Sequence, residues 1–228
     1  MPVTAFSVLA ETTEEADAER EAPRRKEHIR NAAVADILAA AEAVFARAGF
    51  AGATMAEIAD GAGVPKANLH YYFRTKASLY QAVLDNTLTL WLSETDGITM
   101  DADPATALGD YIRAKMRLTA THPDASRVFA NEMLHGAPQI GDYLRNELKA
   151  LVDEKSKAIE HWAKQGKIDP IDPRHLFFTI WAATQTYADF QPQVCAVLGK
   201  SKISRAELDR ATDQLVTLVL KGCGVKIA

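Results

Sequence analysis

The stretch from Thr54 to Phe73 constrains the fold more than any other part of the chain, because it has the spacing of two short helices joined by a tight turn. Thr54 and Glu57 have the spacing of a capping box, which predicts a helix whose first N–H groups are satisfied. Gly63 supplies the positive φ that ends such a helix in a tight turn. Pro65 suits the first turn of the next helix, because its missing N–H is not needed there. The pattern therefore predicts two crossed helices.

Two short helices in this arrangement are typical of a helix-turn-helix, in which the second helix enters the major groove of DNA. That helix covers about residues 65–72. Its outward side chains include four that can meet phosphates or base edges: Lys66, Asn68, His70 and Tyr71. Leu69 and Phe73 are assigned to the core. The alternative interpretation is an ordinary helical hairpin, since short motifs also occur by chance.

Amphipathic helices are predicted on both sides of this motif. Upstream, apolar residues recur at helical spacing from Ala35 to Gly49, and Gly49 is typical of a helix end. Downstream, Thr75 can cap a helix that runs to about Leu92. One side of that helix is apolar and contains Leu79, Val83, Leu84, Leu88 and Trp91. We therefore expect a three-helix module joined to a long fourth helix.

The run AEIADGAGVPKANLHYYFRTKASLY, residues 56–80, resembles the DNA-binding block of the TetR family of transcriptional repressors. The resemblance implies a partly palindromic operator of double-stranded DNA. It also implies that Thr54, Tyr72 and Lys76 hold the DNA backbone. Pro65 departs from the family pattern, because many members carry there a hydroxyl residue that caps the helix and contacts a phosphate.

Three further blocks resemble the pyrimidine-utilisation regulators within that family. They are ASRVFANEMLHGAP (residues 125–138), LKALVDEKS (residues 148–156) and the run from Ile168 to Phe190. In all, the resemblance covers about residues 30–220. It implies a C-terminal domain that binds a small-molecule effector, with uracil or thymine as the expected ligand.

The sequence pattern of the second half of the chain predicts helices throughout, because no segment shows the alternating pattern of a strand. The expected helices cover residues 104–120, 123–136, 140–165, 173–190 and 204–222. The protein is therefore expected to be all-α. Its predicted parts are a disordered or loosely helical tail (residues 1–27), a helix-turn-helix DNA-binding domain (28–75) and a helical ligand-binding and dimerisation domain (76–228).

The helices at 173–190 and 204–221 carry more apolar surface than one domain can cover. A homodimer with a four-helix interface would cover that surface. It would also place two reading helices on half-sites about one helical turn apart. The alternative is a monomer whose last two helices complete its own core.

A pyrimidine effector would need hydrogen-bonding groups and an aromatic surface. The ring presents carbonyl acceptors and N–H donors along one edge, which a carboxamide can match with paired hydrogen bonds. An indole can stack on its face. The candidate contacts are Trp91, Asn131, Trp181, Thr184, Gln185, Tyr187 and Asp189. The alternative for each polar member is an internal hydrogen bond in the core.

Several other classes of protein are disfavoured by the sequence. No apolar stretch reaches the roughly 20 residues that span a membrane, and the acidic N-terminal tail is unlike a secretory signal, so we expect a cytoplasmic protein. Cys195 and Cys223 are too few for a disulfide framework and are expected to be buried thiols. No hydrolase, phosphate-binding or dinucleotide motif occurs, and we predict neither enzymatic activity nor a cofactor.

Two features keep alternatives open. Glu132 and His135 have the Glu-x-x-His spacing of di-iron bundles, although further ligands are lacking. The alternatives to a pyrimidine-responsive repressor are therefore a TetR-like regulator that senses a different small metabolite, and a helical interaction or metal-binding protein without DNA binding. The basic run at residues 24–26 is either an arm that contacts DNA or a solvated charge cluster. The net charge of −4 does not exclude DNA binding, because phosphates attract nearby cations over only about 10 Å.

Overall fold

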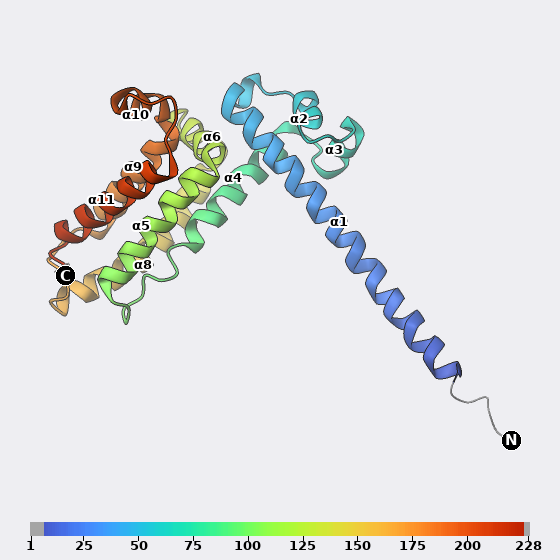
Figure 1. Cartoon of the computed structure of the whole chain (residues 1–228), viewed down its shortest axis with the longest axis horizontal. Helices are drawn as coiled ribbons and strands as arrows, with labels where there is room; N and C mark the ends of the chain where they lie inside the picture. Colours follow the sequence, from blue (N-terminus) through green and yellow to red (C-terminus); the bar gives the residue numbers. More distant parts are fainter. Residues whose placement is uncertain (1–6, 226–228) are drawn as a thin grey trace.

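The computed structural model describes residues 7–225, with side chains from residue 30 onward, and the regular elements in that range are all helical. An N-terminal unit is formed by α1 (Ser7–Gly52), α2 (Met55–Gly61) and α3 (Lys66–Tyr72). From this unit α4 (Lys76–Ser93) leads into a body of packed helices (Figure 1). The all-α prediction is confirmed.

The body consists mainly of long helices that pack side by side (Figure 1). They are α5 (Pro104–Thr121), α6 (Pro123–Leu134), α8 (Lys149–Lys164), α9 (Pro173–Asp189) and α11 (Arg205–Gly222), and the short α10 (Gln191–Leu198) connects the last two. Side chains of Asp103, Asp172 and Ser204 accept backbone N–H groups at the starts of α5, α9 and α11. The sequence predicts these long helices correctly but gives no signal for the short α10.

The first helix begins far earlier than the sequence predicts. The expected helix starts at Ala35, whereas α1 starts at Ser7 and its first half projects away from the rest of the chain (Figure 1). Residues 7–27, expected to be disordered or loosely helical, continue this helix. They are rich in Ala, Glu and Arg, which favour helices even without an amphipathic pattern. Residues 1–6 and the side chains of the basic run at 24–26 lie outside the described part.

The long helix expected over residues 140–165 contains a π-helical turn. α7 (Gly141–Tyr143) is followed by η1 (Leu144–Leu148), and α8 continues directly from it. Such turns often occur at functional sites in helices. In this chain the last residue of the turn, Leu148, lines the cavity described below.

Apolar side chains form two cores. One fills the body and includes Leu108, Trp162 and Phe177. The other lies between the N-terminal unit and α4, around Phe45 and Leu79, and it also contains Val128 of α6. This second core therefore crosses the predicted domain boundary between residues 75 and 76, and it packs α6 directly against the N-terminal unit.

Two smaller predictions can be compared with the described residues. Cys195 and Cys223 are buried free thiols, as expected. Within residues 7–225, no helix combines the length and the apolar character needed to cross a membrane.

Candidate DNA-reading surface and effector cavity

Local hydrogen bonds fix the geometry of the helix-turn-helix. Thr54 Oγ1 accepts the N–H of Glu57 at 3.2 Å, and Glu57 Oε2 accepts the N–H of Thr54 at 3.2 Å. This is the predicted capping box at the start of α2. Gly63 has a φ of +64°, as the tight turn requires. The crossing of α2 and α3 buries Ile58 and Leu69 completely.

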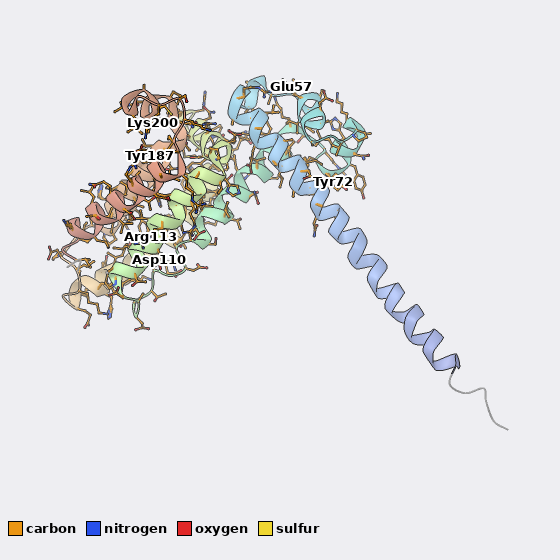
Figure 2. The ribbon with its side chains drawn as sticks, in the orientation of Figure 1. Glu57, Tyr72, Asp110, Arg113, Tyr187 and Lys200 are labelled. Atoms are coloured by element: carbon orange, nitrogen blue, oxygen red, sulfur yellow. The ribbon has the colours of Figure 1, made fainter. Side chains whose placement is uncertain are left out.

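The outer face of α3 is exposed as the sequence predicts. The side chains of Lys66, Asn68 and His70 are exposed, and Tyr71 is 81% exposed. Tyr72, labelled in Figure 2, is half-buried. Its ring meets the Tyr71 ring edge-on at 5.2 Å. Hydrogen-bond donors, acceptors and an aromatic ring thus stand together on one free helix face, which is the chemistry that groove recognition uses.

The start of α3 differs from the predicted helix by one residue. Pro65 occupies the N-cap position rather than the first turn, and no side chain caps the helix there. Its carbonyl accepts the N–H groups of Asn68 and Leu69. The start of α3 is therefore held by backbone hydrogen bonds, without the side-chain cap that a hydroxyl residue would supply.

Lys76 has an internal role that the sequence did not reveal. Its Nζ donates to the carbonyl of Ala53 at 2.9 Å and to that of Ala51 at 3.3 Å. The same ammonium lies 4.8 Å from the centre of the Phe50 ring. Lys76 thus holds the segment between α1 and α2, and a phosphate contact would compete with these carbonyls.

A small cavity lies in the body among α4, α5, α6, η1 and α9. It measures about 40 Å³, which is room for a few water molecules. The lining residues are Leu88, Trp91, Leu92, Tyr111, Lys115, Phe129, Leu148, Trp181 and Gln185. Three of the predicted effector contacts, Trp91, Trp181 and Gln185, are therefore brought together here.

Lys115 is the charged residue that lines this cavity, and it is not among the contacts predicted from the sequence. It is 3% exposed, and its Nζ lies 3.8 Å from the centre of the Trp91 ring. Burial lowers the pKa of the Lys115 ammonium to about 8, although the charges of Asp189 and Glu94 act in the opposite direction. A signal existed in the sequence, because position 115 shares a helical face with Leu108, Ile112 and Thr119.

A hydrogen bond fixes the two rings at the other side of the cavity. Trp181 Nε1 donates to the hydroxyl oxygen of Tyr111 at 2.7 Å. Tyr111 is buried, and burial raises the pKa of its hydroxyl above the ordinary value. Trp181 therefore presents a ring of fixed orientation rather than a free N–H donor.

The other four predicted effector contacts do not line this cavity. Thr184 is buried, and its hydroxyl donates to the carbonyl of Ile180 at 2.8 Å. Asp189 accepts a hydrogen bond from Ser126 Oγ at 2.6 Å. Both side chains thus have the internal partners that the alternative interpretation expects. Asn131 and Tyr187, the latter labelled in Figure 2, line two hollows separate from this cavity.

The Glu-x-x-His element on α6 serves internal hydrogen bonds. Glu132 accepts the hydroxyl of Tyr80 at 3.1 Å, and His135 Nδ1 lies 2.7 Å from the carbonyl oxygen of Asn131. Among residues with described side chains, no three or more His, Cys, Asp or Glu residues are grouped so as to hold a metal ion.

Comparison with known proteins places both parts of the chain. Residues 37–83 match the family described as bacterial regulatory proteins, tetR family, and residues 84–226 match the YcdC-like protein, C-terminal region. The HTH-type transcriptional regulator RutR of Escherichia coli strain K12 is 45% identical over 186 residues, which cover 82% of this chain and 88% of that protein.

Solved structures show the same fold. SCO4942 from Streptomyces coelicolor has a TM-score of 0.60 and 29% identity, with 82% of this chain and 96% of that chain covered. AibR, solved with isovaleryl coenzyme A and operator DNA, has a TM-score of 0.64 and 21% identity, with 82% and 97% covered. The second likeness supports the fold alone.

Proposed function

The chain belongs to the TetR family of bacterial regulatory proteins and is a helix-turn-helix transcriptional regulator related to RutR, and we propose that it is a dimeric repressor that releases its operator when a pyrimidine binds in the body. The proposal has three parts: a reading surface on α3, a symmetric dimer and an effector cavity. Each part has its own support in the described residues.

The reading surface is the exposed face of α3. Lys66, Asn68, His70 and Tyr71 face the major groove and contact base edges or phosphates. Thr54, Tyr72 and Lys76 hold the DNA backbone. The support is the exposure of the first four side chains together with the rigid turn behind them. Lys76 contributes mainly by fixing the segment that leads into α2, because two carbonyls already accept its hydrogens.

The dimer forms through α9 and α11 of each copy. Phe178 on α9 is 51% exposed and Leu218 on α11 is 60% exposed. Large apolar side chains on adjacent helices favour burial against a second copy. Symmetric pairing would carry two α3 helices to the two halves of a partly palindromic operator.

The effector occupies the cavity lined by Trp91, Lys115, Trp181 and Gln185. The observation that carries this assignment is the combination of indole rings, one carboxamide and one buried ammonium around a single space. A pyrimidine 2,4-dione such as uracil or thymine fits it, because Gln185 can pair with an adjacent N–H and C=O. Lys115 then donates to a carbonyl oxygen of the base, and an indole covers the ring face.

Binding must enlarge the cavity. Its present volume of about 40 Å³ is far below the roughly 300 Å³ at which ordinary ligand pockets begin. The effector therefore has to displace lining side chains such as Trp91 or Phe129. Such displacement is how an effector could bias one arrangement of the helices over another.

Titration calorimetry on the full chain tests the effector assignment. We expect uracil and thymine to bind. Cytosine should bind at least about tenfold more weakly, because its amino group would place an N–H donor against the Lys115 ammonium, which is also a donor. Lys115→Met should abolish uracil binding. Lys155→Met is the matched control, since Lys155 is also buried but does not line the cavity. No heat with uracil or thymine, in protein that still binds operator DNA, would reject the assignment.

A further inference from the structure

A buried hydrogen-bonded pair joins α6 to α4 where the body meets the N-terminal unit. Glu132 and Tyr80 are each 3% exposed. Glu132 Oε2 accepts the Tyr80 hydroxyl at 3.1 Å, and Glu132 Oε1 accepts the backbone N–H of Gln139 at 2.6 Å. Both oxygens of this buried carboxylate are thus occupied, by donors from two different segments. A buried carboxylate is tolerated only with such partners, so the pair resists partial displacement.

Tyr80 connects this pair to the DNA-reading unit. Its ring meets those of Phe45 and Phe50 at 4.9 Å each, and both of these residues lie near the end of α1. The Phe50 ring in turn contacts the ammonium of Lys76. Lys76 donates to the carbonyl of Ala53, the residue just before the N-cap of α2. A short series of packed and hydrogen-bonded groups therefore runs from Tyr80 to the helix-turn-helix.

Glu132 connects the same pair to the effector cavity. Phe129 lies three residues before Glu132 on α6, and residues at this spacing lie on neighbouring positions of one helix face. Phe129 lines the cavity, and its ring meets Trp91 of α4 edge-on at 5.0 Å. A ligand that pushes Phe129 or Trp91 aside would therefore move α6 and α4 relative to each other at the Glu132–Tyr80 contact.

The surroundings of the pair leave room for such movement. A hollow of about 350 Å³ lies beside it, between the end of α1 and the end of α6, with Phe50, Tyr80 and Glu132 in its lining. Close packing would resist displacement here, whereas open space permits it. The loop after α6 also holds Ala137 at a φ of +57°, which is strained for a residue with a Cβ. The hydrogen bond from Gln139 to Glu132 helps to hold this loop in place.

We propose that Glu132 and Tyr80 are positioning residues that transmit occupancy of the effector cavity to the helix-turn-helix. When the cavity is empty, the protein exchanges between positions with this hydrogen bond formed and broken; the formed bond locks α6 to α4 and sets the position of α2 and α3 that fits the operator, so operator binding shifts the population toward it. When the cavity is filled, α6 shifts into the adjacent hollow, the bond breaks, and the reading helices leave that position. The inference rests on the proposed function in that the body cavity takes an effector.

A test that does not require the effector uses reciprocity: if cavity and DNA site are coupled, operator binding must change the cavity. Trp91 and Trp181 line the cavity, so their emission reports on it. Operator duplex, obtained by selection from random DNA, is added to the full chain and tryptophan emission is recorded. In parallel, operator affinity is measured with and without saturating uracil. The variants are Tyr80→Phe, Glu132→Gln and the double Tyr80→Phe/Glu132→Met.

The wild type should show an emission change on operator binding, and uracil should weaken operator affinity about 5- to 150-fold. Tyr80→Phe should lose the emission change, and uracil should change its operator affinity by less than about twofold. Glu132→Gln should retain both, because a carboxamide can accept the N–H of Gln139 and donate to the Tyr80 oxygen. If Tyr80→Phe folds poorly, the double variant replaces it, since removing both partners leaves neither a buried phenol nor a buried carboxylate unpaired, and only the N–H of Gln139 loses its acceptor.

Tyr143→Phe is the matched control, because Tyr143 borders the same core and, among the described residues, none accepts a hydrogen bond from its hydroxyl. It should behave as the wild type. A full emission change in Tyr80→Phe, its absence in the wild type, or equal losses in Glu132→Gln and Tyr143→Phe would each overturn the proposal. If the emission change behaves as expected but uracil has no effect on the wild type, the effector assignment fails and the positioning role stands.

Discussion

Lys115 brings an ammonium group into a space otherwise formed by rings, aliphatic chains and one carboxamide. Its attraction to the Trp91 ring and to the more distant Asp189 and Glu94 carboxylates offsets only part of the cost of burial, which is why its pKa falls to about 8. Burial of the Lys115 ammonium at this free-energy cost favours a ligand that supplies a hydrogen-bond acceptor for it. Two predictions follow at the scale of single residues.

The first concerns stability against pH. In the unfolded chain Lys115 keeps its ordinary pKa of 10.5, so between pH 8 and 10.5 the unfolded state binds a proton that the folded state lacks. The free energy of unfolding therefore rises with pH across that window. Below pH 8 the full cost of burying the charged Lys115 ammonium remains. Lys115→Met should stabilise the ligand-free protein at pH 7 by roughly 2–3 kcal/mol and flatten the rise. Urea unfolding at several pH values measures this, and an unchanged pH profile would contradict it.

The second concerns DNA contacts. Lys66→Ala should weaken binding about equally on all sequences and reduce the salt slope by about one unit, because one phosphate contact is lost. Asn68→Ala should instead relax base preference. Lys76→Ala should lower thermal stability as well as affinity, because it removes hydrogen bonds to Ala51 and Ala53. Binding isotherms on specific and random duplexes separate these effects. A Lys66 variant with an unchanged salt slope would remove that residue from the interface.

At the scale of elements, the sequence predicts what local chemistry determines. Thr54 and Glu57 reveal the start of α2 because a capping box is closed within four residues, and Gly63 reveals its end. The cavity is harder to predict, because Lys115 and Tyr111 of α5 meet Trp91 of α4 and Trp181 of α9 only after these three helices pack. A lysine in a helical pattern is read as exposed. The π-helical turn at η1 likewise has no local signal, so the position of Leu148 could not be foreseen.

The turn between α2 and α3 gives a prediction at this scale. Gly63→Ala adds a Cβ that meets nothing within 4 Å, so its cost is the backbone strain of a positive φ, about 1–2 kcal/mol. Gly97→Ala is the control, because Gly97 also has open space but no positive φ. Thermal unfolding should show a lower Tm for the first variant and little change for the second. Equal shifts for the two would show that φ at Gly63 is unimportant.

At the scale of the whole molecule, exposed apolar side chains on α9 and α11 favour burial against a second copy of the chain. The resulting dimer would place two reading helices on one operator. Leu218→Glu should convert the dimer to a 24.9 kDa monomer and weaken operator binding more than about tenfold, because a charge enters the apolar interface. Leu134→Glu is the control, since Leu134 is an equally large, 81% exposed apolar side chain at the end of α6, outside α9 and α11. Sedimentation at micromolar concentration distinguishes them. A wild type that sediments only as a monomer would remove the dimer.

The most direct measurement is the affinity of the wild-type protein for its operator, determined by fluorescence anisotropy without and with saturating uracil. A repressor whose cavity communicates with its reading helices should bind the duplex about 5- to 150-fold more weakly when uracil is present, and Lys115→Met should bind it equally in both conditions. Equal wild-type affinities with and without uracil would contradict the account of this protein as a pyrimidine-responsive repressor.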